Sequence, residues 1–561
     1  MKGYLLFAAI ILTVCFARVS AQEMHSQTHA HDHTHDRSEK LGQVSFTISC
    51  SPSSQKQFNR ATALLHSFWY EEAEKAYAAI TRDDPKCAMA HWGVAMSNYH
   101  PVWAPANKAE LQKGWAAVGS AKSIGVKTER ERAYVAAIEA FFKDHDKLDH
   151  RTRALAYEKA MEQLHVRYPK DREGAIFYAL ALLGTGPVTD KTFANQKKAA
   201  AILNRVLPME PRHPGVAHYL IHSFDYPQLA TYALPAARSY ARIAPSSPHA
   251  LHMPSHIFTR LGLWQESISS NLASAAAAKN HVMKTHPGAA SFDELHAVDY
   301  LVYAYLQGAQ YEKAGQLLSY LKRVTKVDVE QFAAAYAFAA APARYALERR
   351  EWNEAAKLEL HPVNFPWQNF QYAEALIHFA RAIGAARSGD PSTARTAVDR
   401  LASLREELTN KKDAYWANQV EIQRQGAAAW LAFSERKYDE AVKLMRSAAD
   451  LEAASEKHPV TPGAVLPARE LLGDMLLELK RGDEALAAYE ASLRDAPKRW
   501  NSLLGAGLAA ELLGDQAKAR SYYAKVVALG IRADTISPEL RKARKSVRRG
   551  NGPSAKAGKN H

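Results

Sequence analysis

Apolar residues recur at three- and four-residue steps through most of the chain, beginning at Ser54. Ala, Leu, Tyr and Phe fill these positions, and Pro and Gly interrupt the pattern at intervals. This period is that of an amphipathic helix, whereas the alternating pattern of a half-buried strand is almost absent from the sequence. The chain is therefore predicted to be all-α.

The helical pattern repeats at a fixed interval, most clearly near the C-terminal end. A glycine, an alanine and a tyrosine recur 34 positions later: Gly473, Ala485 and Tyr489, then Gly507, Ala519 and Tyr523. Small residues let the two helices of a hairpin approach closely, and the aromatic ring fills the gap behind them. These residues resemble the tetratricopeptide repeat, a helix-turn-helix unit of about 34 residues. The resemblance implies a right-handed superhelical solenoid of helical hairpins, in which the first helix of each hairpin lines a concave surface.

Further copies of this unit can be placed over nearly the whole chain. The segment 54–87 fits the template well, with Ala61, Ala73, Tyr77 and Pro85 in the expected places. Weaker copies are expected at 88–121, 130–169, 172–212, 214–247, 248–281, 295–328, 336–369, 375–408, 422–455, 466–499 and 500–533. We group the copies into an N-terminal array at 51–281, a central array at 282–454 and a C-terminal pair at 455–535.

Three junctions are longer than the template allows, at 185–197, 280–294 and 455–467. Long inserts in repeat arrays form loops on one face and often carry function. The alternative is loop drift without a role.

The two ends of the chain differ in composition from the repeats. Residues 1–21 combine Lys2, an apolar run and the small-residue site Val19-Ser20-Ala21, as a secretory signal does. Residues 22–50 begin with a histidine-rich polar stretch, which predicts a disordered leader that either chelates metal or has no role. Residues 536–561 are predicted to be a basic disordered tail that carries part of the net charge of +14.

The signal predicts a periplasmic or secreted protein. We expect no stable membrane anchor, because every later Ala-rich stretch of the sequence is interrupted by charge. We also expect no nucleic-acid partner, although a basic tail can contact nucleic acid or anionic lipid. Cys50 and Cys87 remain after the signal, and the sequence leaves open whether they form a disulfide.

The strongest chemical pattern lies in two consecutive copies of the repeat, HPGVAHYLIHSFD and SPHALHMPSHIFT. With a shift of 34 positions, His218 aligns with His252 and His222 with His256. Steps of four and three residues return to the same side of a helix. Both copies therefore direct two histidines toward the same inner wall.

Other polar residues join this pattern. Asp225 shares the face of His222, and His249 precedes the second histidine pair by about one turn. The following copy places His296 and Asp299 at equivalent positions. We assign His249 and Asp225 to ligand binding beside the histidine pairs.

Imidazoles from two neighbouring helices, about 8 to 10 Å apart, can converge on one ion. We predict a transition-metal site that holds zinc, copper, nickel or iron. Its ligands would be His218, His222, His252 and His256, with Asp299 or His296 as a further ligand or outer partner. Two other interpretations stay open: the imidazoles hydrogen-bond a peptide or another polar ligand, or they have no function.

Pro254 lies between His252 and His256 and complicates this prediction. A proline there either kinks the helix or marks its first turn. In the second case His252 belongs to the entry loop, and the helical spacing of the pair fails.

A second inner-wall feature is predicted near the N-terminus, where Trp92, Met96, Tyr99 and His100 face inward by the repeat register. Exposed aromatic residues together with Met make an adaptable contact surface for a peptide or hydrophobic ligand. The alternative is that the leader or an adjacent turn packs over them.

Familiar catalytic motifs are missing from the sequence. Tyr219 and Met253 follow the first histidine of each pair, so the HExxH pattern is absent, as are a P-loop, a dinucleotide fingerprint and a nucleophile elbow. The chain also resembles exported bacterial repeat proteins that carry HPG...H...IH and HMPSHIF segments, a resemblance that brings no established reaction.

Our main hypothesis is an exported tetratricopeptide-repeat binding protein. Its concave face would bind a ligand or a protein or peptide partner, with a metal at the histidines. The alternatives are a protein–protein interaction scaffold without metal, and a metal-dependent enzyme in the superhelix cavity. The sequence assigns no catalytic residue.

Overall fold

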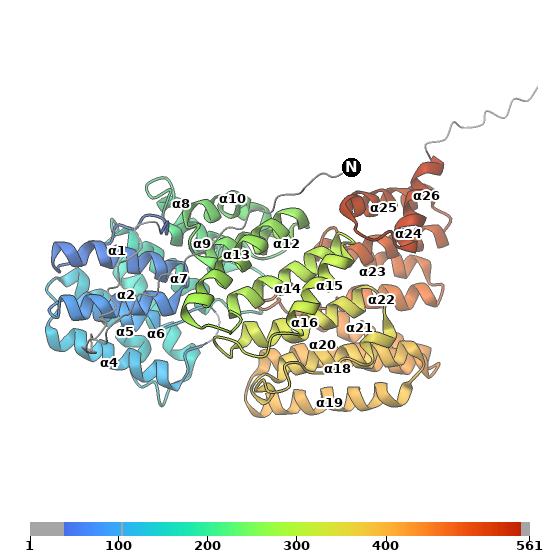
Figure 1. Ribbon diagram of the computed structural model, residues 1–561, viewed down its shortest axis with the longest axis horizontal. Coiled ribbons are helices and arrows are strands. Elements are labelled where there is room, and N and C mark those ends of the chain that lie inside the picture. The colour runs from blue at the N-terminus through green and yellow to red at the C-terminus, as the bar shows by residue number, and fades with distance from the viewer. Residues whose placement is uncertain (1–38, 103–104, 551–561) are drawn as a thin grey trace, which may run out of the picture. The chain divides into compact units, whose positions relative to one another are not determined.

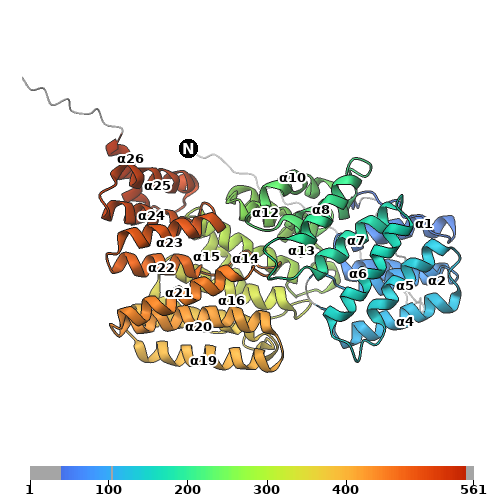
Figure 2. The same cartoon turned by 180° about the vertical axis from the view of Figure 1, so that it is seen from behind.

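The computed structural model describes residues 39–102 and 105–550 (Figures 1 and 2). All regular secondary structure in this part of the chain is helical, apart from one isolated bridge between Ala290 and Val327. The prediction of an all-α fold is confirmed. The predicted signal at 1–21, the histidine-rich stretch up to residue 38 and the end of the tail after residue 550 lie outside the described residues.

The helices follow one another along the chain, and a long connection at 455–467 separates the helix that ends at Ala454 from the one that begins at Ala468. The N-terminal helices are α1 (Pro52–His66), α2 (Tyr70–Asp83), α3 (Ala88–Ser97), α4 (Lys108–Ile124), α5 (Glu129–Phe142), α6 (His150–Arg167), α7 (Arg172–Thr185) and α8 (Ala194–Val206). The next are α9 (Pro214–Phe224), η1 (Ala230–Ala233), α10 (Leu234–Ile243), α11 (Pro248–His252), α12 (Pro254–Arg260), α13 (Trp264–Thr285), α14 (Phe292–Gln307), α15 (Tyr311–Leu321), α16 (Phe332–Glu348) and α17 (Trp352–Ala355). The last are η2 (Trp367–Asn369), α18 (Gln371–Ser388), α19 (Pro391–Asn410), α20 (Ala414–Ser434), α21 (Tyr438–Ala454), α22 (Ala468–Glu478), α23 (Gly482–Asp495), α24 (Trp500–Leu512), α25 (Gln516–Leu529), η3 (Gly530–Arg532) and α26 (Pro538–Gly550).

Consecutive helices pack against each other as hairpins, and both views show α19 to α25 stacked in chain order (Figures 1 and 2). The expected copy at 54–87 corresponds to α1 and α2, and the copy at 500–533 to α24 and α25. The copy at 336–369 departs from the template. Its first helix, α16, is followed by the single turn of α17 and then by irregular chain.

The repeated glycines lie where two helices approach most closely. A Cβ atom on Gly473 or Gly505 would come within 2.8 or 2.2 Å of the ring of Tyr489, and one on Gly507 within 2.6 Å of the ring of Tyr523. Both tyrosines are completely buried. The predicted pairing of a small residue with an aromatic ring is therefore present in the C-terminal hairpins.

The apolar core has two large parts and one small part. The first large part draws its residues from Leu41 to Leu220, and the second from Trp264 to Ala543. The small part comes from α9, α10, α11 and α12. Helix α9 contacts α1 and α7 of the first large part, whereas α11 contacts α13 and α14 of the second. The helices that carry most of the predicted histidines thus connect the two large apolar cores.

The C-terminal part of the predicted leader is ordered, so the prediction of a disordered segment 22–50 is wrong there. Val44, Phe46 and Ile48 are buried, and the ring of Phe46 packs edge-on against Trp92 with centroids 5.4 Å apart. These apolar residues alternate with polar ones, which is the pattern of an extended segment with one buried face. The segment therefore adds to the first core.

The predicted disordered tail is also partly ordered. Helix α26 extends over Pro538–Gly550, and Leu540 and Ala543 are fully buried beside α25. The prediction is wrong for this segment because two apolar residues three positions apart suffice to anchor a basic helix on its neighbour.

Cys50 and Cys87 form a disulfide, which joins the ordered leader to the start of α3. A disulfide is consistent with an oxidising compartment outside the cytosol. Among the described residues, no helix combines the length and the apolar character that a membrane crossing requires.

Candidate metal centre

Six buried histidines from three consecutive hairpins converge in the interior. They are His218 and His222 on α9, His249 and His252 on α11, His256 on α12 and His296 on α14. None of the six is more than 8% exposed. Pro214 and Pro248 occupy the first turns of α9 and α11, where a missing N–H costs no hydrogen bond. The repeat therefore starts both helices at the same point relative to their histidines.

Pro254 separates α11 from α12 without breaking the histidine pair. Met253 keeps a right-handed helical conformation (φ −51°, ψ −36°), and its N–H still donates to the carbonyl of His249 at 2.9 Å. The Nε2 atoms of His252 and His256 lie 3.0 Å apart. Pro254 thus marks a first turn, as one alternative expected, but the chain remains helical through the junction.

The six imidazoles form two groups of three rather than the single site that we predicted. The first triad is His218, His222 and His249, and the second is His252, His256 and His296. Within each triad the ligand nitrogens lie within 4.8 Å of one another. His249, which we had assigned to ligand binding, belongs to the first triad, and His296 is a full member of the second.

Neighbouring side chains fix the protonation of His252 and His256. The Nδ1 atom of His256 lies 3.0 Å from a carboxylate oxygen of Asp225, which can only accept, so Nδ1 carries the hydrogen. The Nδ1 atom of His252 lies 2.6 Å from Oδ1 of Asn271. Because the Asn271 amide nitrogen donates to the carbonyl of Ser267, its oxygen accepts from His252. Both neutral rings therefore have an unprotonated Nε2.

These two unprotonated nitrogens face each other at 3.0 Å, with no hydrogen between them. Two lone pairs at this distance repel unless a cation lies between them. Nitrogen ligands bound to one ion at about 2.0 to 2.1 Å are separated by roughly 2.9 to 3.4 Å for bond angles of about 90 to 110°. The observed separation falls in that range.

A proton is a poor candidate for this cation. Burial, together with His296 and His256, holds the pKa of His252 well below its usual range, and burial likewise lowers the pKa of His256. The Tyr300 hydroxyl, 3.3 Å from the Nε2 atom of His256, donates its hydrogen to the carbonyl of Val460. The arrangement therefore favours a metal ion over an imidazolium.

The first triad is oriented in a similar way. The Nδ1 atom of His218 donates to the backbone carbonyl of His66 at 2.7 Å, which leaves Nε2 unprotonated in the neutral ring. The Nε2 atoms of His222 and His249 lie 3.1 and 3.2 Å from it. The lone pair on Nε2 of His218 thus faces the Nε2 atoms of both His222 and His249. Outer hydrogen bonds of this kind set the tautomer of histidines that bind metals.

The two triads adjoin each other. The ring centroids of His222 and His256 are 6.3 Å apart, and those of His249 and His252 are 6.2 Å apart. A cavity of about 10 Å³ lies against four of the six rings. It is lined by His222, His249, Met253, His256, Phe292, Asp293, His296, Ala333, Pro459 and Val460. This volume suits one ion or water molecule.

Asp225 supports the second triad from outside, where we had predicted a ligand-binding residue. Besides its contact with His256, it pairs with Arg260 at 2.9 Å and Lys457 at 2.8 Å. These two cations hold the pKa of the Asp225 carboxyl well below its usual range despite its burial, so it stays ionised. An ionised partner raises the basicity of a ligating histidine.

Asp299, which we predicted as the alternative to His296 for a further ligand or outer partner, does not take part in either triad. Its carboxylate faces Arg344 at 3.7 Å, and its Oδ1 atom makes no hydrogen bond among the described residues. Burial raises the pKa of Asp299 to about 6. Because a helix turns by about 100° per residue, the side chain of Tyr300 points closer to the direction of His296 than the side chain of Asp299 does. Tyr300 therefore occupies the inward position.

The predicted contact surface near the N-terminus is wrong. Trp92, Met96 and Tyr99 are at most 2% exposed and belong to the first apolar core. The ordered leader covers Trp92, as the alternative interpretation expected. His100 stays half-buried, with its ring 4.4 Å from that of Tyr70.

Sequence reasoning missed the partners that orient the histidines. His252 contacts Asn271, which is 19 residues away, and His218 contacts the carbonyl of His66, 152 residues away. Asp225 contacts Lys457, 232 residues away. The sequence around these partners gives no indication that they contact the histidines or Asp225. The one usable hint was the insert at 455–467, since Lys457 lies within it.

Comparisons with known proteins add only the general likeness of the fold. Neither a protein-family model nor a curated protein sequence matches this chain. It is similar to the human IFIT1 dimer with PPP-AAAA at 14% identity, with 79% of this chain and 91% of that chain covered and a TM-score of 0.39. Yeast Tom70 follows with 10% identity, coverage of 89% and 96%, and a TM-score of 0.33. The TPR domain of P58(IPK) is 15% identical, with 68% of this chain and 99% of that chain covered and a TM-score of 0.21.

These similarities are too distant to carry an argument about ligands or partners. The expectation that nucleic acid is not a partner therefore stays a prediction, as does the expectation of a protein or peptide partner.

Proposed function

We propose that this chain is an exported helical-repeat protein that binds a transition metal in its two histidine triads. The observation that carries this proposal is the pair of unprotonated Nε2 atoms of His252 and His256, which face each other at 3.0 Å. The disulfide between Cys50 and Cys87 is consistent with export.

The donor set restricts the metal. Each triad offers three imidazole nitrogens, which suits zinc, copper, nickel or iron better than calcium or magnesium. The buried ligands also limit what can reach the ion. Only a small molecule would contact it directly, whereas a protein or peptide partner would bind elsewhere on the helical hairpins.

A second candidate function is metal-dependent catalysis. Three protein nitrogens leave a coordination position open, as in catalytic zinc sites with three histidines. The small cavity beside the triads would hold the fourth ligand. Catalytic residues beyond the metal ligands stay unassigned.

The metal content of the purified protein tests the main proposal. Residues 22–38 should be deleted, because their histidines are potential metal ligands outside the triads, whereas Lys40 must stay because its backbone N–H donates to Ser246. After reconstitution with zinc or copper and removal of excess metal, we expect about one ion or more per chain. Less than about a tenth of an equivalent would contradict the proposal and leave the interaction scaffold as the better explanation.

Two further measurements exclude adventitious binding. Replacement of both His252 and His256 by Gln should remove the metal from the second triad, whereas His145→Gln, outside the triads, should retain it. Copper bound to the protein that lacks residues 22–38 but keeps all six triad histidines should show nitrogen hyperfine splitting in electron paramagnetic resonance. This second measurement does not require that the double variant folds, and its absence would also contradict the proposal.

A further inference from the structure

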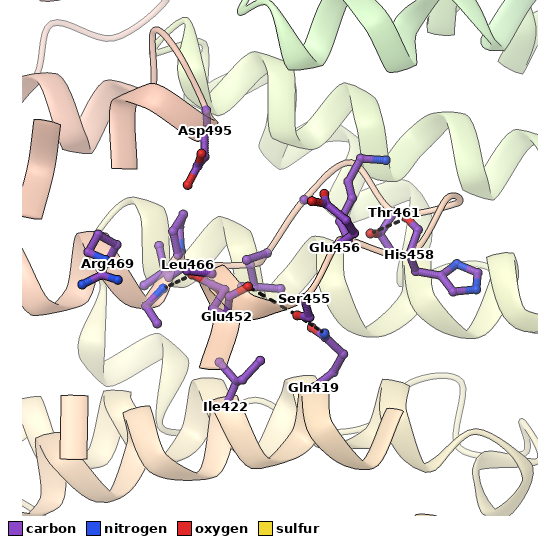
Figure 3. Close-up of a pocket in the computed structure, with 18 of the residues that line it drawn as sticks. Gln419, Ile422, Glu452, Ser455, Glu456, His458, Thr461, Leu466, Arg469 and Asp495 are labelled. Atoms are coloured by element: carbon purple, nitrogen blue, oxygen red, sulfur yellow. Dashed lines mark hydrogen bonds between the residues drawn. The ribbon is translucent and has the colours of Figure 1, made fainter. Parts of the chain in front are cut away.

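A much larger cavity lies beside the predicted insert at 455–467 (Figure 3). Lys457, His458 and Thr461 of this loop line the large cavity, whereas Pro459 and Val460 line the small cavity at the histidine triads. The large cavity has a volume of about 450 Å³. Sites for small organic molecules typically have about 300 to 1,000 Å³.

One wall of this cavity is apolar and aromatic. It is formed by Leu376, Phe379, Ile422, Leu466 and Leu471, together with the rings of Tyr336 and Trp416. Such a wall suits the hydrocarbon part of a ligand. Trp and Tyr rings also attract cations over their faces.

Two carboxyl groups of the cavity, those of Glu452 and Asp495, form no ion pair among the described residues, whereas the third, Glu456, pairs with Lys191. Glu452 extends into the cavity from α21, and its Oε2 atom accepts one hydrogen bond, from the backbone N–H of Ala468 at 2.8 Å. No ion pair of Glu452 is formed within the described residues, and Arg469 on the same wall pairs with Asp450 instead. Burial raises the pKa of Glu452 to about 7, because the lowering effects of the Ala468 N–H and of the more distant Arg499 and Arg469 do not offset it.

Two further acceptors face the same space. Asp495 extends toward the cavity from the end of α23, and it forms no hydrogen bond or ion pair through its side chain in the described part of the chain. The Oε1 atom of Gln423 is buried and accepts no hydrogen bond there. Besides Glu452, the cavity thus presents a carboxyl group and an amide oxygen that accept no hydrogen bond among the described residues.

The cations of the cavity are already neutralised. Lys191 pairs with Glu456 at 2.7 Å. Arg260 and Lys457 both pair with Asp225, at 2.9 and 2.8 Å. A carboxylate ligand would have to compete with these ion pairs, whereas an ammonium group finds two carboxyl groups, Glu452 and Asp495, that form no ion pair among the described residues.

We infer that this cavity binds a small organic amine, whose ammonium group pairs with Glu452 and Asp495 and whose apolar part lies against Trp416 and the aliphatic wall. The inference does not depend on metal binding, since none of the six histidines lines this cavity.

Calorimetric titration of the full chain with 2-phenylethylamine tests this inference. 3-Phenylpropanoate and 2-phenylethanol serve as probes with the same ring and a negative or no charge. We expect the amine to bind at least about tenfold more tightly than either, because a hydrogen-bonded ion pair contributes roughly that factor or more. Absence of amine binding, or equal binding of the three probes, would overturn the inference.

Variants then locate the site. Glu452→Gln keeps the shape of the side chain and should weaken amine binding by about tenfold or more. Asp495→Asn, at an exposed position that is safe for folding, should weaken it by a smaller factor. Glu406→Gln, an exposed change outside the cavity, should leave it unchanged. Unchanged binding by a folded Glu452→Gln variant and by Asp495→Asn would assign the amine to another site and overturn the inference.

Discussion

At the scale of single residues, Asp225 connects the second histidine triad to the rest of the molecule. One of its oxygens contacts the Nδ1 atom of His256 and the ammonium of Lys457, and the other accepts from Arg260. The two cations keep the carboxylate ionised in a buried site, and the carboxylate fixes the tautomer of His256. A residue outside the triad thereby determines which nitrogen of His256 faces the other imidazoles and is available as a ligand.

The effect of Asp225→Asn on metal binding follows from this arrangement. The amide oxygen can still accept from His256, but the negative charge is lost, so we expect metal affinity to fall by about 10- to 100-fold. A competition titration with a chromophoric chelator measures this change. Asp299→Asn is the matched control, because it alters a buried carboxyl group that contacts no histidine of either triad. An equal loss in both variants would mean that Asp225 has no specific role.

At the scale of helices, the hairpins depend on close approach of small residues to buried tyrosines. Tyr77 of α2 lies against Gly93 of α3, where a Cβ would come within 2.2 Å of the ring. The Tyr77 hydroxyl is hydrogen-bonded to Thr62 at 2.7 Å, so the ring cannot easily move away. This contact belongs to the first expected repeat copy and its neighbour.

Gly93→Ala should therefore destabilise the protein by about 1 to 3 kcal/mol, because it overpacks a filled interface. Gly119→Ala is the matched control: Gly119 is exposed in α4, and a Cβ there would meet no atom within 4 Å. That change should stabilise the protein by roughly 0.5 to 1 kcal/mol through helix propensity. Urea unfolding followed by circular dichroism distinguishes the two. Similar effects of both substitutions would contradict the packing argument.

At the scale of the whole molecule, a buried ionic network joins hairpins that are distant in sequence. The Arg499 guanidinium pairs with Glu348 at 2.7 Å and with Glu470 at 2.8 Å, and it donates to the Tyr303 hydroxyl at 2.9 Å. These partners lie on α16, α22 and α14. Such a network holds the central hairpins against the C-terminal ones.

Arg499→Met should destabilise this part of the protein by about 3 to 5 kcal/mol, because two buried carboxylates lose their counter-charge. Adding Glu348→Gln and Glu470→Gln should restore part of the loss, since the uncompensated charges are then removed. Thermal unfolding of the single and triple variants tests both statements. A triple variant less stable than Arg499→Met would show that shape, rather than charge, determines the effect.

The sequence by itself determined the fold and the presence of the histidines. The helical period and the 34-residue interval depend on neighbouring positions, so they predicted the hairpins and placed His218, His222, His252 and His256 on one side of their helices. The alternation of Val44, Phe46 and Ile48 was equally local, but the polar stretch before it concealed that signal.

Only the tertiary structure decided how the histidines group and which atoms face one another. The division into two triads depends on the relative position of separate hairpins, and the protonation of His252 and His256 depends on Asn271 and Asp225, which approach from other helices. The same holds for the cavity at Glu452, whose walls come from segments that local periodicity cannot relate. Contacts between distant segments follow from packing of the whole chain, and packing is not encoded at any single position.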